Sequence, residues 1–102
     1  MSRQKSKKIL TVRELKAKTL PIFIDFDVKE AYLFGSYARG QATKTSDVDI
    51  IIEFKGKKSL FDLVGLRDSL QKVLQRNVDV ATSASIHPAL EKNIKKDFVT
   101  LL

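Results

Sequence analysis

The amino-acid sequence predicts a single small α/β domain (α+β in arrangement), in which a mixed β-sheet is flanked by helices. Its 102 residues match the length of one domain, so one hydrophobic core is expected rather than two. Apolar residues make up 43% of the chain, a share too high for compositional disorder. Segments with strand character alternate with segments of helical periodicity in the order α-β-β-α-β-α, and a short final strand can follow them.

The first helix is expected to begin at a capping box. Thr11 is the N-cap, and Glu14 stands three residues later, where its side chain can reach back to the N-cap. The helix should run to about Leu20 and end there, because Pro21 disfavours a helical conformation in the residue before it. Residues 22–27 alternate apolar and acidic side chains only near their end, so their conformation stays open.

Three strands are expected. Residues 28–34 carry apolar side chains up to the glycine that ends the run. Residues 48–54 (VDIIIEF) are β-branched and almost continuously apolar, which is typical of a strand covered on both faces. Residues 77–81 (NVDVA) form a third, shorter strand.

Two further helices complete the domain. Ser59 is expected to cap a helix over residues 59–75, followed by the turn into the third strand. A last helix should begin near Pro88, a residue that suits a first helical turn, and residues 98–102 should pack back onto the domain. The core-facing residues expected at helical spacing are Leu60, Leu63, Val64, Arg67, Leu70, Val73 and Leu74 in the first of these helices, and Ala89, Leu90 and Ile94 in the second.

Residues 1–10 are expected to form a basic tail, and residues 11–102 the folded domain. A solvated terminus and an arm for nucleic acid or a protein partner both fit this tail. The formal net charge of +7 favours anionic partners such as nucleotides or nucleic acid. The apolar runs are far shorter than the roughly 20 residues that a membrane span needs, and no signal-peptide core is found. A cytoplasmic location is therefore expected, without a membrane.

The residue composition limits the metal chemistry that the chain can support. There are no cysteines, which excludes disulfides and thiolate ligands, and the only histidine is His87. A bound metal would therefore need oxygen ligands, which suits Mg²⁺, Mn²⁺ or Ca²⁺. His87 stands beside a proline at an expected helix start and is interpreted as a surface residue.

Three aspartates can form one acidic cluster. Asp47 and Asp49 stand two residues apart where the second strand begins, so their carboxylates share a face and repel unless they are exposed or bridged by a dication. The second and third strands are joined by the helix over residues 59–75 and are therefore expected to be parallel. Asp79 would then lie beside Asp49, since adjacent strands are about 4.8 Å apart.

A Gly-Ser pair is expected to face this acidic cluster. If the first strand pairs antiparallel with the second, its end brings Gly35 and Ser36 next to the aspartates. Gly35 lets the backbone approach a ligand, and Ser36 offers a hydroxyl and a backbone N–H at the start of a helical turn. Arg39 follows on the same face of such a turn. A phosphate cradle opposite a dication site is one interpretation; an ordinary turn with a solvated strand start and a surface arginine is the other.

The motifs resemble a known superfamily. FGS (residues 34–36), ten intervening residues and DVDI (residues 47–50) match the nucleotidyltransferase signature of the DNA polymerase beta-like superfamily. More narrowly, GSYARGQATKTSDVDI (residues 35–50) resembles the minimal nucleotidyltransferases. VDVATSASIHPALEKNI (residues 78–94) is similar to their third-carboxylate segment. The resemblance covers roughly residues 28–102 and implies the polymerase beta-like nucleotidyltransferase fold.

The resemblance also implies a reaction: transfer of AMP from ATP to a hydroxyl, with release of pyrophosphate. Asp47, Asp49 and Asp79 would bind Mg²⁺, with two ions expected and Mn²⁺ as a substitute. In the two-metal scheme one ion lowers the pKa of the acceptor hydroxyl and the other steadies the triphosphate. Asp79 would lie nearest the acceptor, as a metal ligand and a base.

The nucleotide's phosphates would be held by the Gly-Ser segment and its neighbours. By the resemblance, Gly35 and Ser36 would hold the terminal phosphates, helped by Arg39. Ser46 and Lys44 could also approach them.

The family resemblance further implies a partner. Small members often act as antitoxins that neutralise a HEPN-domain ribonuclease toxin by adding AMP to a tyrosine near its active site, which implies a hetero-oligomer. Two alternatives stay open. The chain could neutralise its partner by binding alone, or it could be a stand-alone transferase acting on RNA or a small molecule. RNA is less favoured, because few aromatic side chains lie outside the expected core to stack on bases.

Overall fold

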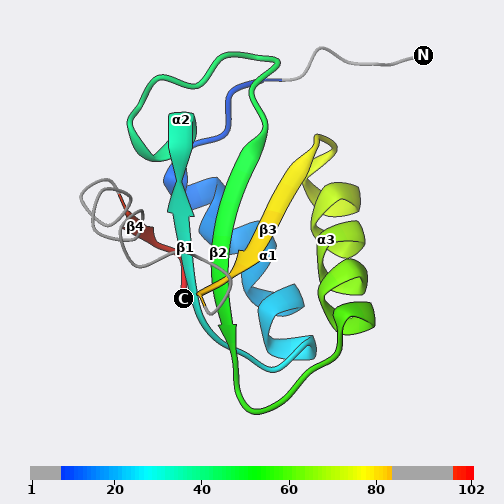
Figure 1. Cartoon of the computed structure of the whole chain (residues 1–102). Helices are drawn as coiled ribbons and strands as arrows, with labels where there is room; N and C mark the ends of the chain where they lie inside the picture. Colours follow the sequence, from blue (N-terminus) through cyan, green and yellow to red (C-terminus); the bar gives the residue numbers. More distant parts are fainter. Residues whose placement is uncertain (1–7, 84–97) are drawn as a thin grey trace.

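The computed structural model describes residues 8–83 and 98–102 and contains a four-stranded mixed sheet with strand order β3-β2-β1-β4 (Figure 1). The strands are β1 (Val28–Phe34), β2 (Val48–Phe54), β3 (Val78–Thr82) and β4 (Val99–Thr100). β1 runs antiparallel to β2 and β4, whereas β2 and β3 are parallel. The predicted strands and the relative directions of the first three are therefore confirmed.

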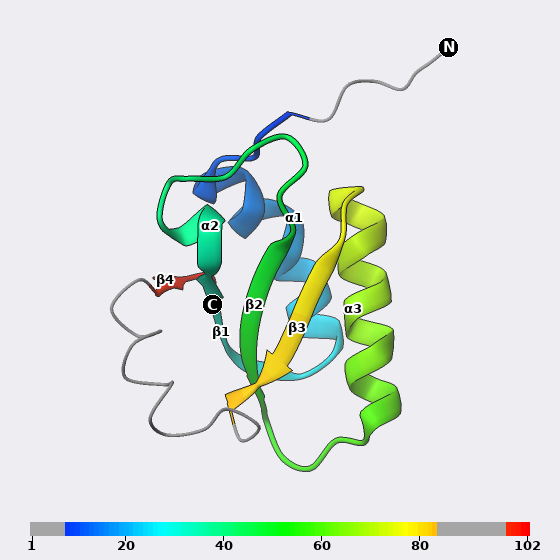
Figure 2. The ribbon, with the colours of Figure 1, turned by 45° about the horizontal axis from the view of Figure 1, so that its top comes forward.

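Two helices cover one face of this sheet. α1 (Val12–Asp25) and α3 (Leu60–Leu74) pack against each other, and Figures 1 and 2 show both of them on the same side of the strands. A single helical turn, α2 (Gly35–Ala38), follows β1 directly. α3 also makes the crossover between β2 and β3, which is why these strands are parallel.

The predicted end of the first helix is wrong. Its capping box forms as predicted, with Thr11 Oγ1 accepting from the Glu14 backbone N–H at 3.1 Å, but α1 continues through Pro21 to Asp25. Proline removes one helical hydrogen bond, the one to the carbonyl of Ala17. Ala17 and Pro21 are both exposed, so water can satisfy this carbonyl. Phe23 beyond the proline is fully buried and anchors the last turn.

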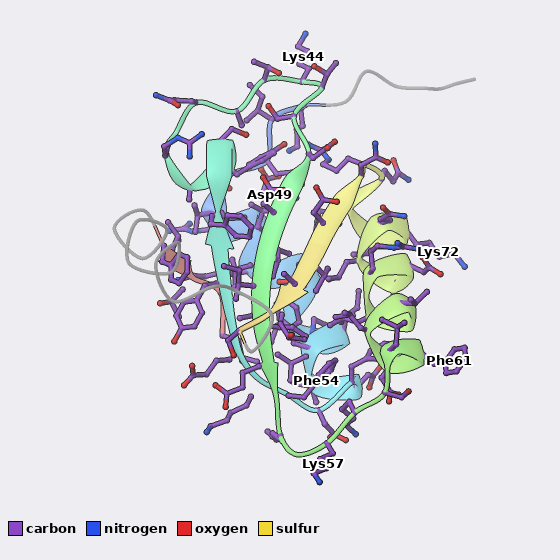
Figure 3. All side chains as sticks on the ribbon, viewed as in Figure 1. Lys44, Asp49, Phe54, Lys57, Phe61 and Lys72 are labelled. Carbon is purple, nitrogen blue, oxygen red and sulfur yellow. The ribbon has the colours of Figure 1, made fainter. Side chains whose placement is uncertain are left out.

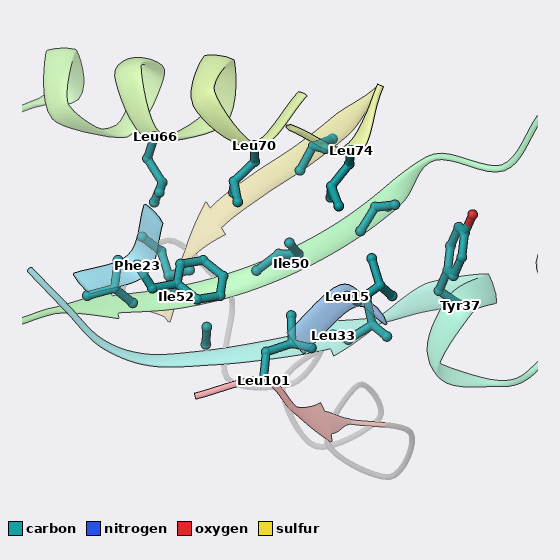
Figure 4. Packing of buried hydrophobic residues seen from close by; sticks show 14 of the residues in the cluster. Leu15, Phe23, Leu33, Tyr37, Ile50, Ile52, Leu66, Leu70, Leu74 and Leu101 are labelled. Carbon is teal, nitrogen blue, oxygen red and sulfur yellow. The ribbon is translucent and has the colours of Figure 1, made fainter. Parts of the chain in front are cut away.

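The core lies between the helices and the inner face of the sheet (Figure 4). Alternate residues of β1 and β2 point into it, including Leu33, Ile50 and Ile52, and Phe23 of α1 meets them. In the described C-terminal segment, Leu101 is buried, and its backbone N–H donates to the Ala31 carbonyl at 2.8 Å. The prediction that residues 98–102 pack back is thus confirmed.

The predicted inward face of α3 needs correction. Ser59 caps the helix as predicted, but its buried residues are Leu66, Leu70 and Leu74, which are spaced by four. Leu66 was not among the predicted core residues, and Leu60 is 73% exposed. Val64, Arg67 and Val73 are exposed too. Periodicity alone could not select the inward stripe, because apolar residues occupy more than one side of this helix.

Some predictions fall outside the described residues. The helix expected near Pro88, with Ala89, Leu90, Ile94 and the neighbouring His87, lies in residues 84–97, and most of the basic tail lies in residues 1–7. Within residues 8–83 and 98–102, no helix has the length and apolarity that crossing a membrane requires.

Two leucines of α3 provide a matched test of this core. Leu70 is fully buried, whereas Leu60 on the same helix is 73% exposed. We expect Leu70→Ala to lower the free energy of unfolding by about 2–5 kcal/mol, because it removes buried methyl groups and leaves a cavity. Leu60→Ala should change it by less than about 0.5 kcal/mol. Urea unfolding followed by circular dichroism measures both; equal losses would contradict the described packing.

Candidate active site

The candidate site lies at one edge of the sheet. There β1 ends and β2 and β3 begin (Figure 1). Asp49 is paired with Phe34 of β1 on one side and with Asp79 of β3 on the other. The acidic residue and the start of the Gly-Ser turn are therefore neighbours across β1 and β2, as the sequence predicts, and Asp79 lies directly beside Asp49.

Gly35 is in close contact with Asp49. Its φ of +75° lies in the left-handed region that side chains disfavour. A Cβ atom at this position would overlap Asp49 Oδ2 and lie 3.3 Å from Asp49 Cγ. Both the backbone conformation and the space therefore require glycine, and the close approach brings the start of α2 against the carboxylate.

Asp49 lies on the sheet face opposite the helices, where Figure 3 labels it. Its pKa is raised from 3.8 to about 6, first by burial and then by Asp79, which acts through its negative charge and a side-chain hydrogen bond. The charge of Asp47 adds a smaller upward effect, and the nearby guanidinium of Arg39 opposes the rise. Asp49 and Asp79 are thus close enough to share a proton. When both carboxylates are charged they repel each other, unless a cation between them offsets the charge.

The three aspartates differ in how far they are exposed to solvent. Asp49 is half-buried, whereas Asp47 and Asp79 are exposed. In the part of the chain that the structure describes, no three acidic or histidine side chains are arranged closely enough to hold a metal ion. The chemistry of these side chains nevertheless fits a hard dication, because all three are carboxylates and two of them already interact. The assignment of all three as metal ligands stays a prediction.

Ser36 and Arg39 lie where the sequence places them. Ser36 is the second residue of α2, and no side chain caps the N-terminus of this turn. Arg39 ends the turn, and its Nε donates to Gln41 Oε1 at 3.1 Å. Because the charge of Arg39 lowers the pKa of Asp49, the guanidinium lies within electrostatic range of the site. Their roles toward phosphate stay predictions.

Ser46 and Lys44 belong to the loop between α2 and β2. Ser46 Oγ accepts a hydrogen bond from the Thr43 backbone N–H at 2.8 Å, and the Ser46 N–H donates to the Thr43 carbonyl at 3.1 Å. The hydroxyl of Ser46 thus stabilises this turn. Figure 3 shows Lys44 at the tip of the loop, with Asp49 below it on β2.

Two residues next to the site were not singled out by the sequence. Arg76 Nη1 donates to the hydroxyl of Tyr37, the residue after Ser36, at 2.6 Å. The two side chains come from segments 39 residues apart, so no local pattern could reveal the contact.

The family follows from a comparison with known proteins. A profile of the nucleotidyltransferase domain matches residues 12–101, nearly the whole chain. The chain belongs to the nucleotidyltransferase domain family. The resemblance stated from the FGS and DVDI motifs is thereby confirmed, and the edge of the sheet described above is where this nucleotidyltransferase carries those motifs.

Individual relatives support the same family. A Methanocaldococcus jannaschii protein named "putative protein adenylyltransferase" is 46% identical over 93 residues, which cover 91% of this nucleotidyltransferase and all of the relative. The protein adenylyltransferase MntA of Thermococcus cleftensis is 35% identical over 74 residues, or 72% of this chain and 75% of that protein.

Solved structures confirm the fold class. A minimal nucleotidyltransferase structure superimposes with a TM-score of 0.76 at 24% identity, covering 88% of this chain and 95% of the other. A toxin–antitoxin crystal structure with AMP-PNP gives a TM-score of 0.75 at 24% identity, covering 85% of this chain and 72% of the other. At these identities the likeness shows that this nucleotidyltransferase shares their mixed-sheet fold.

The raised pKa of Asp49 predicts how stability depends on pH. The folded protein holds this proton more tightly than the unfolded chain, since the pKa rises from 3.8 to about 6. The stabilisation is therefore present below pH 3.8 and lost as the pH rises through about 6. Asp49→Asn cannot ionise, so its free energy of unfolding should not fall in this pH range. In metal-free buffer, its Tm minus that of wild type should be larger at a pH of about 7.5 than at about 4.5. A constant or shrinking difference in thermal melts would contradict this.

Proposed function

We propose that this nucleotidyltransferase transfers AMP from ATP to a tyrosine hydroxyl of a partner HEPN-domain toxin, releasing pyrophosphate, and so acts as an antitoxin. The observation that carries the proposal is the contact of Gly35 with Asp49 beside Asp79, which sets the backbone of the Gly-Ser turn against a pair of carboxylates. A triphosphate with its magnesium ions is the ligand that needs both features at once.

The relatives support the choice of nucleotide and acceptor. Proteins that are 46% and 35% identical to this chain carry the name of protein adenylyltransferases. The fold is shared with an MNT antitoxin solved in complex with a tri-AMPylated Shewanella oneidensis HEPN toxin, with a TM-score of 0.70 at 20% identity. We therefore propose a hetero-oligomer with such a toxin. The cytoplasm, which supplies ATP, is the proposed location.

The proposed chemistry forms a bond between the acceptor oxygen and the α-phosphorus of ATP and breaks the bond from that phosphorus to the bridging oxygen of the pyrophosphate. Asp47, Asp49 and Asp79 would hold Mg²⁺. When bound, Mg²⁺ offsets the charge of the phosphates and makes the acceptor hydroxyl more acidic. Asp79, exposed at the edge of β3, would accept the hydroxyl proton from the incoming tyrosine.

Binding of the triphosphate would fall to the turn after β1. The backbone at Gly35 and Ser36 would hold its terminal phosphates, since in the described residues no side-chain hydrogen bond caps the N-terminus of α2. Arg39 would add positive charge from the end of the same turn. Holding the α-phosphate in line with the acceptor is the main contribution of these residues to the rate, because phosphoryl transfer depends largely on positioning and charge.

A carboxylate substitution tests the proposed reaction. Incubation of the protein with ATP, Mg²⁺ and a HEPN-domain partner should add adenylate-sized masses to the partner, detected by mass spectrometry. Asp49→Asn should lower the rate at least about 100-fold, since it removes a charge that acts on the reacting phosphate. Asp68→Asn provides the control, because Asp68 lies on α3 and pairs with the neighbouring Arg67; it should react like wild type.

The same variants separate catalysis from binding. If Asp49→Asn still transferred AMP at the wild-type rate, the site assignment would be wrong. If it transferred none and yet protected cells from the toxin, neutralisation would rest on binding alone. Transfer to the end of an RNA, but not to the protein partner, would replace the proposed acceptor.

Magnesium should stabilise the folded protein through these carboxylates. Because Asp49 and Asp79 repel each other when both are charged, a dication bound between them should raise the Tm at a pH of about 7.5. We expect millimolar MgCl₂ to raise the Tm of wild type and of Asp68→Asn in thermal melts. It should not raise that of Asp49→Asn. An equal shift in all three proteins would indicate a salt effect and contradict a metal site.

A further inference from the structure

Arg76 occupies the turn that leads from α3 into β3. Gln75 ends α3 in the left-handed conformation, with a φ of +56°. The chain then reverses, so that the Arg76 side chain lies back over the end of the helix, and its Nε donates to the Leu74 carbonyl at 2.9 Å. Three residues later, β3 presents Asp79 to the site. Arg76 therefore belongs to the segment that delivers the third carboxylate.

The same guanidinium also contacts α2, the turn that carries Gly35 and Ser36. Its Nη1 donates to the Tyr37 hydroxyl at 2.6 Å and to the Lys8 carbonyl at 2.9 Å. One nitrogen can make both bonds because Nη1 carries two hydrogens. These three acceptors are uncharged, and in the described residues Arg76 forms no ion pair. Its geometry suits the joining of separate segments, since arginine presents its donors as a rigid fork.

Tyr37 connects this fork to the Gly-Ser turn. Tyr37 is 6% exposed and belongs to the core cluster, as Figure 4 shows. It lies in α2, which has only four residues, too few for a helix to be stable by itself. The position of Gly35 and Ser36 is therefore set by the neighbours of α2. α2 follows β1 directly, the side chain of Tyr37 anchors it in the core, and Arg76 holds the hydroxyl of that side chain.

We propose that Arg76 is a positioning residue for catalysis. Through the Tyr37 hydroxyl it holds the Gly35–Ser36 backbone at a set distance from Asp49 and Asp79. This inference rests on the proposed function, since it assigns Arg76 a role in the AMP transfer. The reason that position matters is the tight contact of Gly35 with Asp49 Oδ2, because a small shift of α2 moves the phosphate-binding backbone relative to the carboxylates.

The test compares Tyr37→Phe, Arg76→Met and the double variant with wild type. Tyr37→Phe removes only the hydroxyl and keeps the buried ring, so it should fold. Arg67→Met is the matched control, an exposed arginine of α3 whose recorded hydrogen bonds reach only its neighbour Asp68. Two readouts are needed: the ¹H–¹⁵N shifts of the Gly35 and Ser36 amides, and kcat and KM for AMP transfer.

We expect both single variants to shift the Gly35 and Ser36 amides and to lower kcat about tenfold, with a smaller change in the KM for ATP. The double variant should be no slower than Arg76→Met, because that substitution already removes the bond to the Tyr37 hydroxyl. Arg67→Met should match wild type in both readouts.

Several results would overturn the proposal. They are unmoved amides in Tyr37→Phe, a wild-type kcat in Tyr37→Phe, or multiplied losses in the double variant. If Arg76→Met does not fold, Tyr37→Phe decides alone. Absence of AMP transfer by wild type would refute the proposed function instead, and the amide shifts would still decide whether Arg76 sets the position of the turn.

Discussion

The register of β2 with its two neighbours is the constraint on which the candidate site depends. Asp49 is opposite Phe34 in one direction and Asp79 in the other, and these two pairings bring all parts of the site to one edge of the sheet. A slip of one residue would turn Asp49 toward the helices and Ile50 toward the opposite face of the sheet. The burial of Ile50 and Ile52 in the core opposes this slip, so the packing of one face of β2 determines the chemistry of the other.

Much of the architecture could be predicted because strong local signals agreed with one another. β2 consists almost entirely of β-branched residues between two polar segments, and its predicted bounds match the structure. The parallel direction of β2 and β3 followed from their connection, since a helical crossover requires parallel strands. The antiparallel pairing of β1 with β2 was an assumption, and the structure bears it out. From direction and position, the proximity of Gly35, Asp49 and Asp79 followed with no tertiary information.

What the sequence could not show depends on contacts between distant segments. Pro21 is compatible with a helix only because its exposed side lets water replace a hydrogen bond while Phe23 stays buried. The inward stripe of α3 was decided by the shape of the sheet and α1, against which Leu66 packs and Leu60 does not. Arg76 had no recognisable motif, because its role depends on a tyrosine in another element.

The crossover through α3 has a consequence for how the protein folds. β1 and β2 are close in sequence and can pair early, but Asp79 reaches Asp49 only after the chain has closed a long loop around the helix. The acidic pair is therefore a non-local contact, and the entropy of closing this loop opposes its formation. A cation that bridges both carboxylates would select completely folded chains from partly folded ones, and its occupancy would report on the whole sheet.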